Sequence, residues 1–249
     1  MQGTLEDALR TVLRVDEVST TCAGRTDAGV HARDQVVHTD VPSGAYEDQA
    51  AVLAHRLAGV LPGDVGLRSL DPAPAGFDAR FSPLWRRYAY RVSDAPYGVH
   101  PLRRHDVLHH RRPLDVRAMT EAAPPLLGEH DFAAFCRRRQ GSTTVRTVRE
   151  LMWERDPDGL VVATVRADAF CHNMVRALVG AMLAVGDGRR PSQWPAQVLA
   201  GRERVPDVQV VAAHGLTLEE VRYPADDQLA AQAEAARRRR DAPAPGAGG

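Results

Sequence analysis

The stretch AGRTDAGVHA, residues 23–32, is the most informative part of this 249-residue chain. It lies between two apolar segments, residues 18–22 and 35–41, whose composition is typical of strands. Its two glycines allow a tight turn and let a ligand approach the backbone closely. The turn therefore presents the carboxylate of Asp27 two residues away from the guanidinium of Arg25.

Two explanations of Asp27 follow from these residues. A carboxylate close to a guanidinium is expected to stay ionised, as a nucleophilic carboxylate must be. An ordinary aspartate turn with a local ion pair explains the same pattern more simply. The residues by themselves leave a catalytic and a structural role for Asp27 open.

Apolar periodicity on both sides of this stretch predicts helices that alternate with strands. Predicted helices are residues 4–13, 47–57, 116–127 and 170–185, and further predicted strands are residues 65–70, 86–92, 145–154, 160–167 and 216–223. A capping box of Thr4 and Asp7 is expected to begin the first helix. This order predicts an α/β (α+β) fold, in which two similar halves form a mixed, largely antiparallel sheet with helices packed on it.

The chain divides into three parts. We expect an N-terminal half at residues 1–95, which carries the Asp27 turn, and a C-terminal half at residues 96–224, which completes a cleft beside it. From residue 225 the sequence is rich in Gln, Ala and Arg and then in Ala, Pro and Gly. Such a composition predicts a disordered tail over residues 225–249, after a frayed helix.

Composition excludes several classes of protein. Hydrophobic residues make up 44% of the chain and charged residues 26%, which is typical of a globular protein. The formal net charge is +0, so a nucleic-acid contact would require a local cluster of basic residues, all of which are arginine. The widely spaced Cys22, Cys136 and Cys171 argue against a zinc ribbon or a disulfide scaffold and fit a reducing cytoplasm. Apolar runs fall short of the ~20 residues that span a membrane.

A segment rich in histidine and arginine, residues 97–113, has three alternative explanations. It contains His100, His105, His109 and His110, but they form no helical pair with a nearby carboxylate, so a metal site is disfavoured. Contact with RNA phosphates and a merely solvated loop remain equal alternatives, because arginines are interleaved with the histidines. Further basic runs are residues 137–139 and 237–240.

Residues 24–32 resemble the signature loop of the tRNA pseudouridine synthase A (TruA) family. Other stretches resemble the family's blocks in the same order, namely residues 77–82 with 87–90, 128–132, 169–176 with 179–180, and 215–218 with Val221 and Tyr223. The resemblance covers residues 1–223 and implies the pseudouridine synthase fold.

The resemblance also implies roles for individual residues. Asp27 would be the catalytic nucleophile, and Arg176 would meet its carboxylate. Arg25 would pair with Asp27 or with a phosphate of the flipped nucleotide. Tyr88 would stack on the target base, in place of the stacking lost on flipping, and take part in proton transfer, while Leu216 would line the base pocket. Without the resemblance, Tyr88 is simply a strand aromatic and Arg176 a helix arginine that reaches water.

The activity that the resemblance implies is that of an isomerase. It would convert uridine to pseudouridine at positions 38 to 40 of the tRNA anticodon stem-loop. No metal or organic cofactor is expected, because the leaving uracil is itself the later nucleophile. Asp27 would attack the anomeric carbon or the ring, or a sugar proton would be removed first; the sequence leaves these three routes open.

The expected assembly is a cytoplasmic homodimer, with tRNA bound across both subunits and no membrane contact. Two other functions are a non-catalytic RNA-binding protein with the same fold and a metal-dependent hydrolase that uses the histidines. The presence of Arg25, Asp27, Tyr88 and Arg176 favours the enzyme over both.

The beginning of the sequence departs from the family pattern. Family members usually have a first strand and a Gly-Trp-Gln-type loop before the helix that this chain begins with, MQGTLE at residues 1–6. We therefore expect that the N-terminal half as written lacks its first strand, and that a version extended upstream would be more stable.

Overall fold

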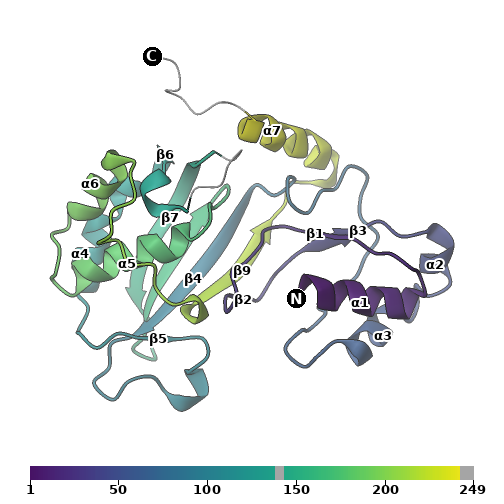
Figure 1. Ribbon diagram of the computed structural model, residues 1–249, viewed down its shortest axis with the longest axis horizontal. Coiled ribbons are helices and arrows are strands. Elements are labelled where there is room, and N and C mark those ends of the chain that lie inside the picture. Colours follow the sequence, from purple (N-terminus) through teal and green to yellow (C-terminus); the bar gives the residue numbers. More distant parts are fainter. Residues whose placement is uncertain (138–142, 242–249) are drawn as a thin grey trace.

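The computed structural model describes residues 1–137 and 143–241 and centres on a seven-stranded sheet (Figure 1). Its strands, in spatial order, are β2 (His31–Ala32), β9 (Leu216–Arg222), β4 (Trp85–Ser93), β8 (Val161–Ala167), β7 (Val145–Arg155) and β6 (Gly128–Asp131), while β5 (Leu108–His109) also pairs with β4. Only the short β2 and β5 pair in parallel with their neighbours; the long strands pair antiparallel. The predicted mixed, largely antiparallel sheet is confirmed, whereas the division at residue 95 and the likeness of the two halves stay predictions.

Three helices pack together on one face of this sheet (Figure 1): α4 (Val116–Ala122), α5 (Met174–Gly186) and α6 (Trp194–Gly201). The central helix is α5, in which every residue except Arg176 is buried. On the sheet side, alternation along β4 places Arg86, Tyr88, Tyr90 and Val92 on the buried face. The position of α5 is therefore fixed by packing, and Arg176 is the polar side chain that this helix presents.

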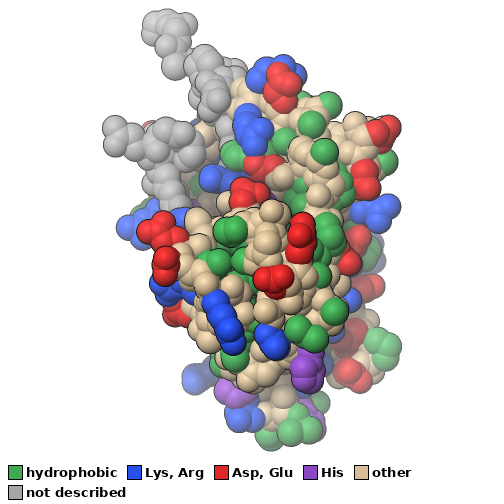
Figure 2. All heavy atoms as spheres, turned by 90° about the vertical axis from the view of Figure 1, so that its right-hand side faces the viewer, with side chains coloured by type: hydrophobic (Ala, Val, Ile, Leu, Met, Phe, Trp, Pro, Cys, Tyr) green, Lys and Arg blue, Asp and Glu red, His purple; other side chains and the backbone are tan. Residues whose placement is uncertain are grey.

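A smaller module holds the N-terminal residues. In it β1 (Thr20–Cys22) pairs antiparallel with β3 (Val37–Thr39), beside α1 (Gln2–Leu13), α2 (Ser43–Glu47) and α3 (Leu53–Val60). Its own apolar cluster is made by Ala8, Leu9, Val12, Leu13, Leu53 and Leu57. Figure 2 views the molecule from this side, where acidic and basic side chains are interspersed.

Two predictions for this module are wrong. Residues 65–70 are irregular instead of a strand, because Leu67 and Leu70 pack against the α1–α3 cluster instead of beside another strand. The helix predicted at residues 47–57 is divided into α2 and α3 by turns at residues 48–52. Apolar spacing alone does not show where a segment finds its packing partner.

Both ends of the described chain also differ from expectation. Because α1 begins at Gln2, Thr4 lies inside the helix, and Asp7 forms an ion pair with Arg10 in place of the predicted capping box. Residues 225–249 were predicted as a frayed helix followed by a disordered tail; residues 229–241 form the helix α7 (Leu229–Asp241), which is docked, with Leu229 and Ala233 buried. These two residues, one helical turn apart, supply an apolar contact that the low-complexity composition concealed; residues 242–249 lie outside the described part.

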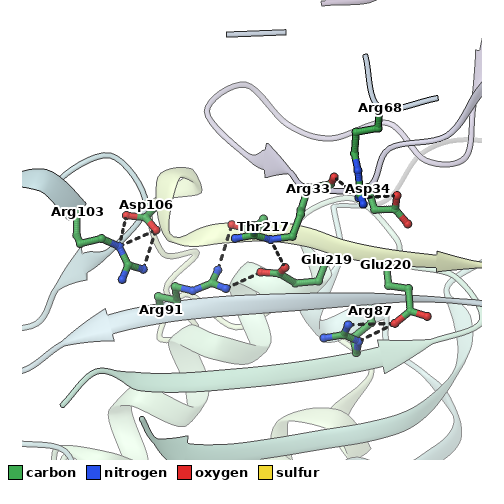
Figure 3. Close-up of polar contacts among 10 residues, drawn as sticks. All are labelled: Arg33, Asp34, Arg68, Arg87, Arg91, Arg103, Asp106, Thr217, Glu219 and Glu220. Carbon is green, nitrogen blue, oxygen red and sulfur yellow. Dashed lines mark hydrogen bonds and ion pairs between the residues drawn. The ribbon is translucent and has the colours of Figure 1, made fainter. Parts of the chain in front are cut away.

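Arginines on the outer face of the large sheet are paired with carboxylates (Figure 3). Glu219 on β9 accepts hydrogen bonds from Arg91 at 2.6 Å and from Arg33 at 2.9 Å. Arg87 and Glu220 form a further pair at 3.0 Å. Pairs of this kind add little stability individually, but they neutralise the arginines locally.

The segment that precedes β9 crosses α5 at Gly180, and this close crossing makes a testable prediction. A Cβ atom at Gly180 would lie 1.8 Å from the carbonyl oxygen of Gln209. We expect Gly180→Ala to push this segment away and to lower the free energy of unfolding by about 1–3 kcal/mol or more, measured by thermal and denaturant unfolding.

A matched control for this test is Gly59→Ala, in α3. A Cβ atom there meets nothing within 4 Å, so this change should leave stability unchanged or raise it slightly. Equal melting temperatures for Gly180→Ala and the unmodified protein would contradict the close crossing.

Candidate active site

Asp27 lies in the loop of residues 23–30, between β1 and β2, which we call the Asp27 loop. The start of the loop is anchored by two hydrogen bonds, from the Ala23 amide to the Val36 carbonyl at 2.8 Å and from the Gln35 side chain to the Gly24 carbonyl at 2.9 Å. Gly29 adopts a φ of +84°, which a residue with a side chain rarely does. The positive φ explains why a glycine stands at position 29, two residues after Asp27.

The carboxylate of Asp27 is held from one side by residues at the start of α5. Arg176 Nη1 donates to Asp27 Oδ2 at 3.0 Å, and His172 Nε2 lies 3.3 Å from Asp27 Oδ1. Arg176 is itself fixed, because its Nε donates to the carbonyl of Val211 at 2.7 Å. The Asp27 side chain remains 27% exposed, so a reactant can reach it.

The backbone at the start of α5 has an unusual conformation. Asn173, which precedes the helix, has φ 68° and ψ 0°, in the left-handed region that asparagine tolerates better than most residues. Such conformations cost free energy and tend to occur where function requires them. Here the turn sets His172 and Arg176 on the same carboxylate.

Apolar walls stand beside Asp27. Tyr88 on β4 and Leu216 at the start of β9 line the same cavity and are 8% and 5% exposed. The ring of Phe170 meets Tyr88 edge-on, with 5.1 Å between centroids. Burial raises the pKa of Tyr88 to about 12, against the opposing effect of Arg86, so its phenol is neutral at ordinary pH.

The cavity has a volume of about 910 Å³ and a strongly positive lining. Among the described residues that line it, Asp27 is the single carboxylate, and the arginines are Arg25, Arg80, Arg86, Arg137, Arg146, Arg176 and Arg237. The whole chain has a formal net charge of +0, so positive charge is concentrated at this site. A cavity of one sign attracts a ligand of the opposite sign.

Arg25 was expected to pair either with Asp27 or with a phosphate of the flipped nucleotide. The carboxylate of Asp27 is occupied by Arg176 and His172, while Arg25 is exposed and lines the cavity. The expectation that Arg25 pairs with Asp27 is therefore not what the structure shows. Side chains two positions apart in a turn point in different directions, which leaves contact with a phosphate as the expected role.

Arg86 is a site residue that the sequence analysis missed. It is 7% exposed, and its guanidinium donates to three backbone carbonyls, those of Asp168 at 2.7 Å, Ala23 at 2.7 Å and Arg80 at 2.6 Å. Burial lowers the pKa of Arg86. The sequence feature that could have identified Arg86 was its position on the apolar face of β4, two residues before Tyr88. An arginine on a buried face must find hydrogen-bond partners there.

The cysteines differ from expectation. Cys136 and Cys171 are joined by a disulfide, with Cα atoms 5.7 Å apart, and Cys171 lines the cavity beside His172. They lie 35 residues apart in sequence and meet because the turn η3 (Ala133–Phe135) packs against α5. The wide spacing hid this pairing.

Several residues of the histidine-rich segment contact neighbouring groups. His110 contacts Asp187 at 3.1 Å, and His31 contacts the carbonyl of His105 at 2.6 Å. Arg103 forms hydrogen bonds with both oxygens of Asp106. In the described part of the chain, no group of three or more His, Cys, Asp or Glu residues is arranged to hold a metal ion. Arg138 and Arg139 of the second basic run lie outside that part.

The described residues include no helix that is long and apolar enough to cross a bilayer.

A family model for tRNA pseudouridine synthase matches residues 122–224. The tRNA pseudouridine synthase A of Streptomyces griseus is 61% identical over 248 residues, which cover 99% of this chain and 87% of that protein.

Similar relatives occur in other bacterial species. The tRNA pseudouridine synthase A of Frankia casuarinae is 60% identical over 98% of this chain and 88% of its own length. That of Mycobacterium leprae is 45% identical over 92% of this chain and 83% of its own length. On these identities and coverages, the chain belongs to the tRNA pseudouridine synthase A family, whose members are isomerases that convert uridine to pseudouridine.

Proposed function

We propose that this protein isomerises uridine at positions 38 to 40 of the tRNA anticodon stem-loop, with Asp27 as the nucleophile. The observation that carries the proposal is that, among the described residues, one carboxylate and seven arginines line the cavity. Arginine binds phosphate oxygens with two parallel hydrogen bonds, so this lining suits an RNA backbone. The carboxylate is the group left to react with the nucleotide that enters.

The geometry suits a base taken out of its stack. Flipping costs a few kcal/mol, part of which an aromatic and apolar pocket recovers. Tyr88 and Leu216 supply such walls, and Arg25 is exposed at the same cavity for a phosphate of the flipped nucleotide. The neutral phenol of Tyr88 can donate a hydrogen bond to the base and relay a proton.

Arg176 prepares Asp27 for reaction. Because Arg176 is fixed by Val211 and holds Oδ2, the carboxylate keeps one orientation before substrate binds. This orientation serves each of the three routes, namely attack on the anomeric carbon, attack on the ring and prior removal of a sugar proton. The leaving uracil becomes the later nucleophile, so the proposal includes no metal or organic cofactor.

We also propose a cytoplasmic homodimer that binds tRNA across both subunits. The support is the family membership and the resemblance of residues 24–32 to the signature loop. Light scattering coupled to size-exclusion chromatography measures the mass in solution, and a mass of one chain would contradict the dimer.

Asp27→Asn is expected to abolish pseudouridine formation and to leave tRNA affinity within a few fold. The amide preserves size and hydrogen bonding but lacks the nucleophilic charge. The measurement is chemical mapping of pseudouridine in tRNA transcripts, with single uridines at positions 38, 39 and 40 replaced in turn. Asp40→Asn, an exposed carboxylate outside the cavity, serves as the control and should retain full turnover.

Normal turnover by Asp27→Asn would disprove the assignment of the nucleophile. Product at other tRNA positions, with none at 38 to 40, would retain the enzyme and correct its target.

Tyr88 is expected to remain protonated to well above pH 10. The folded chain binds this proton more tightly than the unfolded chain, where tyrosine has a pKa near ~10. Its contribution to stability is therefore complete below pH ~10 and is lost as the pH rises toward 12. Ultraviolet titration of tyrosinate measures the pKa of Tyr88, taken from the difference between the titration curves of the unmodified protein and Tyr88→Phe.

Tyr88→Phe should still bind tRNA, because the ring is retained, but turn over more slowly. A Tyr88 tyrosinate signal near pH 10 in the folded protein would contradict the buried phenol.

A further inference from the structure

We propose that the C-terminal helix α7 is a tRNA-binding element, with Arg237 contacting an RNA phosphate at the mouth of the Asp27 cavity. This inference rests on the proposed function, since it assigns a further contact to the same substrate. It concerns residues beyond the stretch, ending at Tyr223, that resembles the family's blocks.

The helix α7 is docked in a defined position near the large sheet, at the top of the view in Figure 1. Leu229 and Ala233 are each 2% exposed, and Ser82 Oγ donates to the carbonyl of Leu229. Gly76 has a φ of +76°, and a Cβ atom there would lie 2.7 Å from the Cβ of Ala230. The backbone at Gly76 therefore passes so close to α7 that a glycine is required at this position.

Docking brings Arg237 to the cavity wall. Its guanidinium lies over the ring of Phe81, 4.9 Å from the centroid, and the guanidinium of Arg80 lies 5.1 Å from the same centroid. All three residues line the cavity that contains Asp27. Two cations on one ring repel each other, so an anion that approaches both is favoured.

Arg237 has a carboxylate partner, Asp78. Asp78 forms an ion pair with Arg237, and although burial alone would raise its pKa, hydrogen bonds from the Phe81 and Arg80 amides and the charge of Arg237 hold that pKa below its usual range. One negative charge leaves the two guanidiniums with an excess of positive charge. The Arg237 side chain is 49% exposed, so a phosphate can reach it.

A purely structural role for Arg237 makes a different prediction. If Arg237 serves only to fasten residues 78–82, then removing the charge of Asp78 should reproduce the loss of Arg237. Asp78→Asn tests this, because an amide oxygen at the same place still accepts from the amides of Arg80 and Phe81, 2.8 and 2.9 Å from Asp78 Oδ1. If Arg237 binds phosphate, Asp78→Asn leaves that contact available.

The experiment measures the affinity of the full-length protein for a tRNA transcript at several salt concentrations. Arg237→Gln is expected to weaken binding about fivefold to tenfold and to reduce the slope of log affinity against log salt by about 0.7–0.9, the value for one phosphate. Asp78→Asn should keep the slope of the unmodified protein.

The matched control is Arg238→Gln on the same helix. Arg238 is 70% exposed, pairs with Glu234 and lies outside the described cavity lining, so its loss should leave affinity and slope unchanged. An unchanged slope in Arg237→Gln, or an equal loss in Asp78→Asn, would overturn the proposal. Pseudouridine formation by the unmodified protein tests the proposed function separately, because a protein that binds tRNA without forming product fails there alone.

Discussion

The hydrogen-bonded ion pair of Arg176 and Asp27 is the contact on which the site depends. It joins residues 149 positions apart, one on the loop that leaves the small module and the other on the helix at the centre of the large core. Every other residue of α5 is buried, so the helix cannot shift without disturbing the core. The orientation of the carboxylate is therefore set by packing on the far side of the cavity, and the site exists only when both apolar clusters are assembled.

Charge is distributed differently on the outer face of the sheet and around the cavity. On the outer face of the sheet, arginines such as Arg91 and Arg87 meet glutamates, which neutralise them. Around the cavity, Arg176 and Arg237 have carboxylate partners, and Arg86 is satisfied by carbonyls. A neutral chain thus acquires a positive cavity through placement alone. Net charge gave no indication of it, because a sum over the chain carries no information on position.

The apolar pattern of the sequence predicted those helices and strands that are determined by local periodicity. Alternation in β4, β7 and β8 and the apolar run of α5 correspond to observed elements, because each buries one face or the whole of itself. The sequence singled out Asp27 as a candidate because its loop is a contiguous motif. His172, Arg86 and Arg237 were missed as site residues, since their importance arises from contacts across 63 or more residues: His172 with Asp27, Arg86 with Ala23 and Arg237 with Asp78. The periodicity of apolar residues in the sequence gives no information on such long-range contacts.

Arg86 shows how a buried charge is made tolerable and useful. A guanidinium that is 7% exposed is costly unless its donors are used, and here they are used by carbonyls from three separate segments. Ala23 begins the Asp27 loop, Arg80 belongs to the wall that α7 reaches, and Asp168 follows β8. A donor left without its carbonyl would raise the cost, so all three segments are held together. The same buried cation thereby couples the position of the Asp27 loop to that of the arginine-lined wall.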